Sequence, residues 1–175
     1  MTSLVAIDWG TTNCRAFRMG AGGEILEKRA NALGILAVKN ANFSGALMDL
    51  TRDWIDVPTA PAVLMCGMIG SAQGWIEAPY LPIPAGAEDV AGQLVLAPDP
   101  RREIHVVPGL RGSGAAGPDV MRGEETQIFG TGIRKWCFVA HGGVVNQYVH
   151  LGKTGSEPLA ICRQGHIRHH GLDAT

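Results

Sequence analysis

The chain has 175 residues, of which 46% are apolar and 18% charged, and this composition excludes wholesale disorder. A formal net charge of −1 gives no electrostatic reason to expect a nucleic acid or an anionic membrane as a partner. No apolar run approaches the roughly 20 residues that cross a bilayer, no signal peptide opens the chain, and the four cysteines form no CxxC pair. We therefore expect a compact cytoplasmic protein with free thiols.

The amino-terminal third predicts three strands followed by a helix. The strands cover residues 3–8, 14–19 and 24–30, and a glycine-rich turn joins the last two. The helix covers about 42–54, because apolar residues recur on one face at helical spacing after a capping pair. The capping residues are Asn42 and Ser44, and the apolar face consists of Phe43, Leu47, Leu50 and Trp54.

The remainder of the first 136 residues predicts alternating strands and helices. The continuous apolar run at 62–66 suits a strand buried on both faces. A short helix at 87–94, a strand at 103–107, a flexible glycine-rich segment at 112–117 and a helix at 122–133 follow. The order βββαβαβα predicts an α/β lobe with a mixed central sheet and ribonuclease-H-like (actin-like ATPase) topology.

The turn between the first two strands has the chemistry of a phosphate site. Glycine lets the backbone approach phosphates, successive N–H groups form an anion-binding concavity, and a carboxylate can hold Mg²⁺ through its waters. No lysine follows, so this is not the GxxxxGK[ST] loop. The alternative is an ordinary β-turn in which the same residue types supply only turn chemistry. The polar turn residues are Asp8, Gly10, Thr11, Thr12, Asn13 and Arg15.

A second polar group begins the last predicted helix. Glu124 and Glu125 follow Gly123 there, and carboxylates are favoured at a helix start for structural reasons alone, so ordinary solvated residues are the alternative. If this helix start and the Asp8 turn converge across one crevice, a carboxylate can take the proton of an acceptor hydroxyl. We predict Glu124 as this base, Glu125 as second candidate, and Arg122 as a clamp for a substrate carboxylate.

Several segments carry a family resemblance. D-x-G-T-T-x-x-R resembles the phosphate motif of the actin/hexokinase/sugar-kinase superfamily. AIDWGTTNCRAF, MCGMIGSAQGW, APYLPIPAG, VVPGL and VMRGEETQIFG, in this order over residues 1 to about 134, resemble the 2-dehydro-3-deoxygalactonokinase family. That family phosphorylates a keto-deoxy sugar acid, 2-dehydro-3-deoxygalactonate, at its 6-hydroxyl in galactonate breakdown, using ATP and Mg²⁺.

The resemblance implies roles for individual residues. The turn from Asp8 to Arg15 would bind the ATP phosphates, with Asp8 also holding the metal. Further residues would line the sugar-acid pocket near Arg122, although Trp75 and Tyr80 are equally well explained as core aromatics. The implied pocket residues are Met68, Ile69, Gly70, Ser71, Trp75 and Tyr80.

The chain departs from the family after residue 136. Family members are about two such lobes long, and the second lobe supplies the adenine pocket. Residues 137–175 hold five of the six histidines and show little sustained apolar period, so we expect a poorly ordered tail that arose by frameshift or truncation. The alternative for the tail is a zinc site, although its spacings match no strong paired-ligand pattern. Its ligands would be Cys137, His141, Cys162, His166 and His169.

Three functional hypotheses remain. The first is a kinase lobe with little activity by itself, since phosphoryl transfer needs both substrates in a closed site. The second is a non-catalytic sugar-acid-binding or assembly protein, in which an apolar face left bare would promote self-association. The third, a nuclease, needs several carboxylates around two metals, and here Asp8 has only Glu124 and Glu125 as companions.

Overall fold

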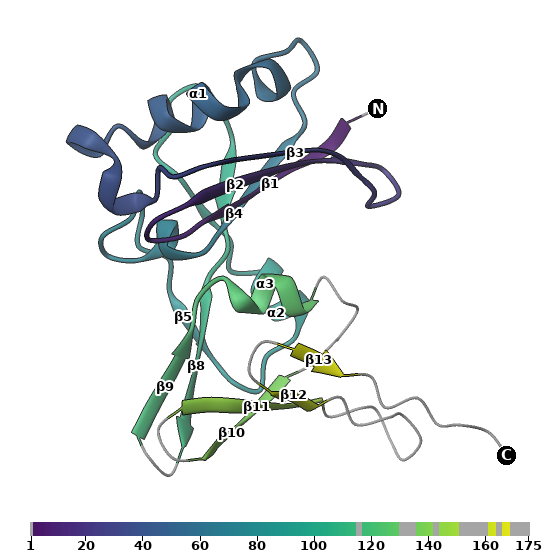
Figure 1. Cartoon of the computed structure of the whole chain (residues 1–175), viewed down its shortest axis with the longest axis vertical. Helices are drawn as coiled ribbons and strands as arrows, with labels where there is room; N and C mark the ends of the chain where they lie inside the picture. Colours follow the sequence, from purple (N-terminus) through teal and green to yellow (C-terminus); the bar gives the residue numbers. More distant parts are fainter. Residues whose placement is uncertain are drawn as a thin grey trace, which may run out of the picture. The chain divides into compact units, whose positions relative to one another are not determined.

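The computed structural model describes residues 2–114, 117–129, 136–141, 144–150, 161–163 and 166–168. The chain divides into two compact units, which are described separately below (Figure 1). The first unit comprises Met1–Pro79 and Gln93–Pro108, and the second comprises Tyr80–Gly92 and Gly109–Thr175. Within the described part of the chain, no helix has the length and apolar character needed to cross a membrane.

The first unit is built on a six-stranded mixed sheet of order β3-β2-β1-β4-β7-β6. The strand β1 is antiparallel to β2 and parallel to β4, and β4 is in turn parallel to β7. This confirms the α/β, ribonuclease-H-like prediction, with β6 as an additional edge strand. The bounds are β1 (Thr2–Trp9), β2 (Cys14–Gly20), β3 (Ile25–Asn31), β4 (Ala62–Cys66), β6 (Val95–Leu96) and β7 (Ile104–Val106).

Helix α1 (Phe43–Ile55) lies across one face of this sheet (Figure 1). The predicted cap is confirmed, since the Asn42 side chain accepts a hydrogen bond of 3.0 Å from the Gly45 N–H. The predicted apolar face of the helix packs into the core together with the inward residues of the central strands. The largest buried core side chains include Val5, Ile7, Trp9, Phe43, Leu47, Trp54, Met65, Ile69 and Ile104.

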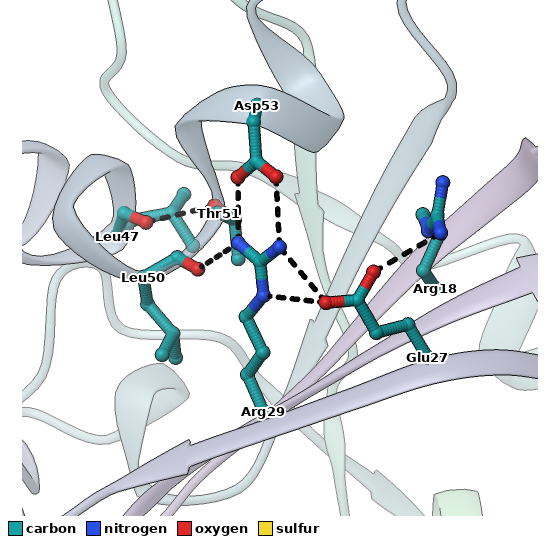
Figure 2. A network of polar contacts seen from close by, with 7 residues as sticks. All are labelled: Arg18, Glu27, Arg29, Leu47, Leu50, Thr51 and Asp53. Atoms are coloured by element: carbon teal, nitrogen blue, oxygen red, sulfur yellow. Dashed lines mark hydrogen bonds and ion pairs between the residues drawn. The ribbon is translucent and has the colours of Figure 1, made fainter.

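A polar network also fastens α1 to β3 (Figure 2). Arg29 donates to both carboxylate oxygens of Asp53, at 2.6 and 2.7 Å, and to the Leu50 carbonyl at 3.0 Å. Its guanidinium lies 4.1 Å from the centroid of the Trp54 ring, a cation–π contact. The hydrogen bond from Arg29 lowers the pKa of Asp53. Arg29 therefore fixes the second half of α1 against the edge of the sheet.

The second unit contains two smaller sheets. A three-stranded sheet has the order β5-β8-β9, and helices α2 and α3 belong to the same unit. A four-stranded antiparallel sheet follows, with the order β10-β11-β12-β13. The bounds are β5 (Tyr80–Pro82), α2 (Ala87–Ala91), β8 (Gly109–Gly114), β9 (Gly117–Met121), α3 (Glu124–Phe129), β10 (Trp136–His141), β11 (Val144–His150), β12 (Ile161–Arg163) and β13 (His166–Arg168).

Part of the sequence interpretation of this unit was wrong. The described residues of the segment 112–117, which was expected to be flexible, belong to the antiparallel pair β8–β9, which runs from Leu110 opposite Met121 to Gly114 opposite Gly117. Backbone hydrogen bonds need no side chain, so a glycine-rich segment can pair once a partner strand is present. The helix expected at 122–133 begins at Glu124, and its predicted end lies outside the described residues.

The predicted boundary at residue 136 does not coincide with the division into two units, and both it and the poorly ordered tail at 137–175 stay predictions. The four strands β10 to β13 lie in or next to that stretch, and much of the rest of it lies outside the described residues. The side chains of the proposed zinc ligands are likewise outside the described part, so the zinc alternative is untested.

Candidate functional site

Asp8 lies at the carboxyl end of β1, opposite Arg15 on β2 and beside Cys66 on β4. The Arg15 Nη2 atom is 2.5 Å from Asp8 Oδ2, so the two residues form an ion pair across the hairpin. The Asp8 side chain is 17% exposed and that of Arg15 48%, which leaves both reachable from solvent. The pairing follows from the hairpin register, and it places a cation and a carboxylate side by side at the edge where parallel strands end.

The turn after β1 is tight and presents polar groups at its tip. The N–H of Gly10 donates to the carbonyl of Asn13 at 2.9 Å, which closes the turn. Thr11, Thr12 and Asn13 are exposed, and the Asn13 side chain donates to the Thr12 hydroxyl at 3.1 Å. The predicted phosphate-binding residues thus lie on the connection between β1 and β2 or, for Asp8 and Arg15, at the adjoining ends of these two strands.

A segment that the sequence interpretation did not single out holds this turn from one side. The N–H groups of residues 34–36 donate to the three carbonyls of residues 10–12. These bonds join Gly34 to Thr12 at 3.0 Å, Ile35 to Gly10 at 3.0 Å and Leu36 to Thr11 at 3.4 Å. The turn therefore has its carbonyl groups facing residues 34–36.

This arrangement fixes the direction of the turn's N–H groups. In a planar trans peptide the carbonyl and the following N–H point in opposite directions. The N–H groups of residues 11–13 therefore point away from residues 34–36, and none of them donates to another residue in the described part of the chain. Successive N–H groups that face one side form a concavity suited to an anion.

Gly67, directly after β4, brings the next loop against Asp8. Its φ of +92° is in the region that favours glycine. A Cβ there would lie 2.8 Å from the Trp9 carbonyl oxygen and 3.3 Å from Asp8 Oδ1. Because only glycine fits this close approach, Gly67 determines how the β4 loop passes the carboxylate.

The predicted pocket loop begins with the 3₁₀ turn η3 (Met68–Gly70), whose Ile69 and Gly70 are buried. The Ser71 hydroxyl donates to the Met68 carbonyl at 2.7 Å, which stabilises the turn locally. Trp75 stacks on Phe43 with ring centroids 6.2 Å apart and packs against the core. This packing favours the core interpretation of Trp75.

In the second unit, Tyr80 and Arg122 form one polar-aromatic pair. The guanidinium carbon lies 4.0 Å from the Tyr80 ring centroid, and Nε donates to the Tyr80 hydroxyl at 3.0 Å. Gly109 makes room for the ring, since a Cβ at that position would lie 2.6 Å from two Tyr80 ring carbons. Arg122, only 9% exposed, is thereby held in one orientation.

The two predicted acids differ sharply in burial. Glu124 is exposed and accepts from the N–H of Arg122 at 3.1 Å. Glu125 is fully buried and accepts from the N–H of Gly123 at 2.6 Å and from the Thr126 hydroxyl at 3.3 Å. The pKa of Glu125 is raised to about 7, mainly by burial and also by the charge of Glu124, while the hydrogen bonds to its carboxylate oppose this rise.

The site residues thus fall into two groups, one in each unit. The Asp8 turn and the Met68–Ser71 loop belong to the first unit, whereas Tyr80, Arg122 and both acids belong to the second. The predicted crevice needs both the Asp8 turn of the first unit and the Glu124 helix of the second. That these two elements converge stays a prediction.

Asp8 is a single, partly exposed carboxylate at the end of β1. Among the described residues no group of three or more histidine, cysteine, aspartate or glutamate side chains could hold a metal ion. Mg²⁺ commonly takes one or two carboxylates together with waters and substrate phosphates. A single partly exposed carboxylate is compatible with that pattern, and the metal role of Asp8 stays a prediction.

Comparison with known proteins identifies the family. The sequence profile described as 2-keto-3-deoxy-galactonokinase matches residues 8–155. The chain belongs to this family. A protein of Rhizobium meliloti (strain 1021) named a probable 2-dehydro-3-deoxygalactonokinase is 38% identical over 152 residues, covering 87% of this chain and 47% of that protein. The 2-dehydro-3-deoxygalactonokinase of Escherichia coli (strain K12) is 40% identical over 126 residues, covering 72% and 41%.

A solved structure agrees with this membership. The structure, from Sinorhizobium meliloti and described as a 2-dehydro-3-deoxygalactonokinase, matches with a TM-score of 0.67 and 29% identity. The match covers 95% of this chain and 52% of that one, so the chain spans about half the length of these galactonokinase relatives. The family match also runs to residue 155, past the predicted boundary at 136.

Proposed function

We propose that this chain carries the phosphate-binding and sugar-acid-binding residues of an ATP-dependent kinase that phosphorylates the 6-hydroxyl of 2-dehydro-3-deoxygalactonate. The observation that supports this most strongly is the orientation of the turn at residues 10–13. The carbonyls of residues 10–12 accept hydrogen bonds from the N–H groups of residues 34–36, and the N–H groups of residues 11–13 face the other side. Family membership supports a kinase with ATP as phosphoryl donor.

In the proposed nucleotide half, the N–H groups of residues 11–13 and the hydroxyls of Thr11 and Thr12 bind phosphate oxygens. Asp8 holds Mg²⁺, and Arg15 orients the Asp8 carboxylate and adds positive charge beside the phosphates. When bound, Mg²⁺ neutralises charge that develops on the phosphoryl group. The chain contributes the positioning, which is the main source of catalysis in phosphoryl transfer.

In the proposed sugar-acid half, Arg122 binds the substrate carboxylate. Its guanidinium is fixed by the Tyr80 ring and hydroxyl, and a fixed planar fork is suited to bidentate carboxylate binding. The loop Met68–Ser71 supplies further pocket surface, while Trp75 acts behind that loop by packing.

Glu124 is the proposed general base. As the sugar oxygen forms a bond to the γ-phosphorus and the bond to the bridging oxygen of ADP breaks, the hydroxyl proton passes to the carboxylate. Glu124 is exposed and so can reach a substrate, whereas Glu125 is fully buried. Glu125 remains the second candidate because a base with a pKa near 7 is well matched to neutral pH.

Calorimetric titration of the chain with MgATP and with 2-dehydro-3-deoxygalactonate, separately, tests both halves. We expect D8N to weaken MgATP binding and R122K to weaken sugar-acid binding. Two exposed positions provide matched controls with the same chemical change: Asp49 on α1 for D49N and Arg111 on β8 for R111K. The kinase proposal is wrong if the unsubstituted chain binds the sugar acid but not MgATP.

That last result would instead support a non-catalytic sugar-acid-binding protein, the second candidate function. The observation in its favour is the Tyr80–Arg122 pair, which is formed within the second unit from residues of that unit alone. In either case we propose a cytoplasmic protein whose ligands are small molecules, with no nucleic acid or membrane as partner. Self-association through an apolar face also stays a proposal, testable by light scattering.

A further inference from the structure

We propose that the segment Leu33–Leu36, which lies just after β3, is a positioning element for the phosphate-binding turn and that Gly34 is its decisive residue. This inference rests on the proposed function, because it assigns the turn at residues 10–13 to phosphate binding. To the site residues of the proposed function it adds residues without polar side chains, which act only by holding the turn in place.

The first support is the number of hydrogen bonds between the segment and the hairpin. Three N–H groups of the segment bind the carbonyls of residues 10–12. A fourth bond runs in the other direction, since the Trp9 indole N–H donates to the Leu33 carbonyl at 2.8 Å. Every carbonyl of the turn up to Thr12 is therefore fixed by a segment more than twenty residues later in the chain.

The second support is the absence of space at Gly34. A Cβ there would lie 2.2 Å from the Thr11 carbonyl oxygen and 2.3 Å from the Thr12 nitrogen. Both are backbone atoms of the turn, so they cannot move aside as the end of a flexible side chain can. The segment and the turn are thus in direct backbone contact, and any side chain at position 34 displaces the turn.

The third support is that the segment is itself anchored. Ile35 is 4% exposed and belongs to the hydrophobic core, and the Leu33 N–H donates to the Asn31 side chain at 3.1 Å. The hairpin tip is therefore tied to the core rather than free to move. A turn that is ordered before it binds loses less conformational entropy on binding, which strengthens the binding of its ligand.

The experiment compares MgATP binding by the chain and by G34A in calorimetry. Because a misplacement of about 1 Å can cost up to about 100-fold, we expect G34A to bind MgATP at least about tenfold more weakly. Its affinity for 2-dehydro-3-deoxygalactonate should stay within about twofold of the unsubstituted value. A merely structural defect would lower both affinities together, so this split identifies a positioning role.

G92A is the matched control. Gly92 follows α2 at a negative φ, and a Cβ there meets its nearest atoms at 3.4 and 3.6 Å, ordinary contact distances. We expect G92A to bind both ligands as the unsubstituted chain does. If G34A binds MgATP as tightly as G92A, the inference is wrong while the proposed function stands. If the unsubstituted chain binds no MgATP, the proposed nucleotide site itself fails, and the inference fails with it.

W9F provides a milder second variant in case G34A does not fold. It removes the indole N–H that binds the Leu33 carbonyl and keeps an aromatic ring in the core. One hydrogen bond contributes about 1 kcal/mol, so we expect MgATP affinity to fall about threefold to fivefold. An unchanged MgATP affinity in W9F would also overturn the inference.

Discussion

The two polar turns of this chain, at residues 10–13 and 122–125, are stabilised in opposite ways. The first is held by N–H groups from a distant segment, so the N–H groups of residues 11–13 and the exposed side chains of these residues face the other side. The second is held by its own acids, since Glu124 binds the Arg122 N–H and Glu125 binds the Gly123 N–H. The comparison indicates that the first turn is ordered by a distant segment, whereas the second is ordered by the side chains of its own two acids.

The largest effect is expected when each of the two acids of the second turn is substituted and the activities of the two variants are compared. Under the proposed function, E124Q should lower kcat for phosphoryl transfer by about 10²–10⁴-fold in a version of the chain extended by a second kinase lobe, because it removes the base. The Gln oxygen can still accept from the Arg122 N–H, so the turn should persist. E125Q is the control, in which most activity should remain. The opposite ranking in a coupled kinase assay would make Glu125 the base.

The second largest effect is expected in the pH dependence of folding stability, which reflects the ionisation of Glu125. Its folded pKa of about 7 is raised above the ordinary value of 4.5, so between these values the folded state binds more protons than the unfolded state. Stability should therefore fall as pH rises from about 4.5 to about 7, by on the order of 3 kcal/mol. Urea unfolding across this pH range measures the free energy of unfolding, and E125Q should remove most of its decrease with pH. A slope that is identical in E125Q would show that another group is responsible.

Backbone strain at Gly67 gives a smaller effect in the first unit. Because of its φ of +92° and the close Trp9 carbonyl, G67A should lower the free energy of unfolding by about 1–3 kcal/mol. It should also weaken MgATP binding, since the new methyl group would press against Asp8. Chemical denaturation of G67A beside G92A tests this, and equal stability of the two variants would show that the loop adapts.

The smallest effect is expected far from both turns, at the Asp53–Arg29 contact on the surface of α1. D53N should change stability only slightly, and the difference should shrink further as salt is added, because exposed ion pairs contribute little and are screened. Ligand binding should be unaffected. A large loss of MgATP affinity in D53N would mean that α1 takes part in positioning the first turn.

Sequence patterns were sufficient for the elements with strong periodicity. The strands β1 to β4 and the cap and apolar face of α1 were predicted because apolar spacing, turn residues and capping residues mark them in the sequence. The short strands β5 and β6 were not predicted, since strands of two or three residues depend on a partner strand rather than on their own composition. The end of β8 at residues 112–114 and the start of β9 at Gly117 were mistaken for part of a flexible segment, because their pairing also depends on a partner strand.

In the candidate site, too, some features could be predicted from the sequence and others could not. The residue types of the Asp8 turn were sufficient to predict its chemistry, and the hairpin register explains why Asp8 and Arg15 meet. The role of residues 33–36 was missed because it rests on backbone hydrogen bonds, and Gly34, its only sequence signal, looks like any turn glycine. The burial of Glu125 beside the exposed Glu124 was equally hidden, because neighbouring residues of one type carry no signal of which one faces inward.

The central claim, that the outward N–H groups of residues 11–13 receive a nucleotide's phosphates, can be observed directly. The measurement is a titration of the ¹⁵N-labelled chain with MgATP, followed through the backbone amide signals. The account predicts large saturable downfield shifts for Thr11, Thr12 and Asn13, and small changes for the already bonded amides of residues 34–36. Saturable binding that leaves the three turn amides unchanged, or no binding of MgATP, would contradict it.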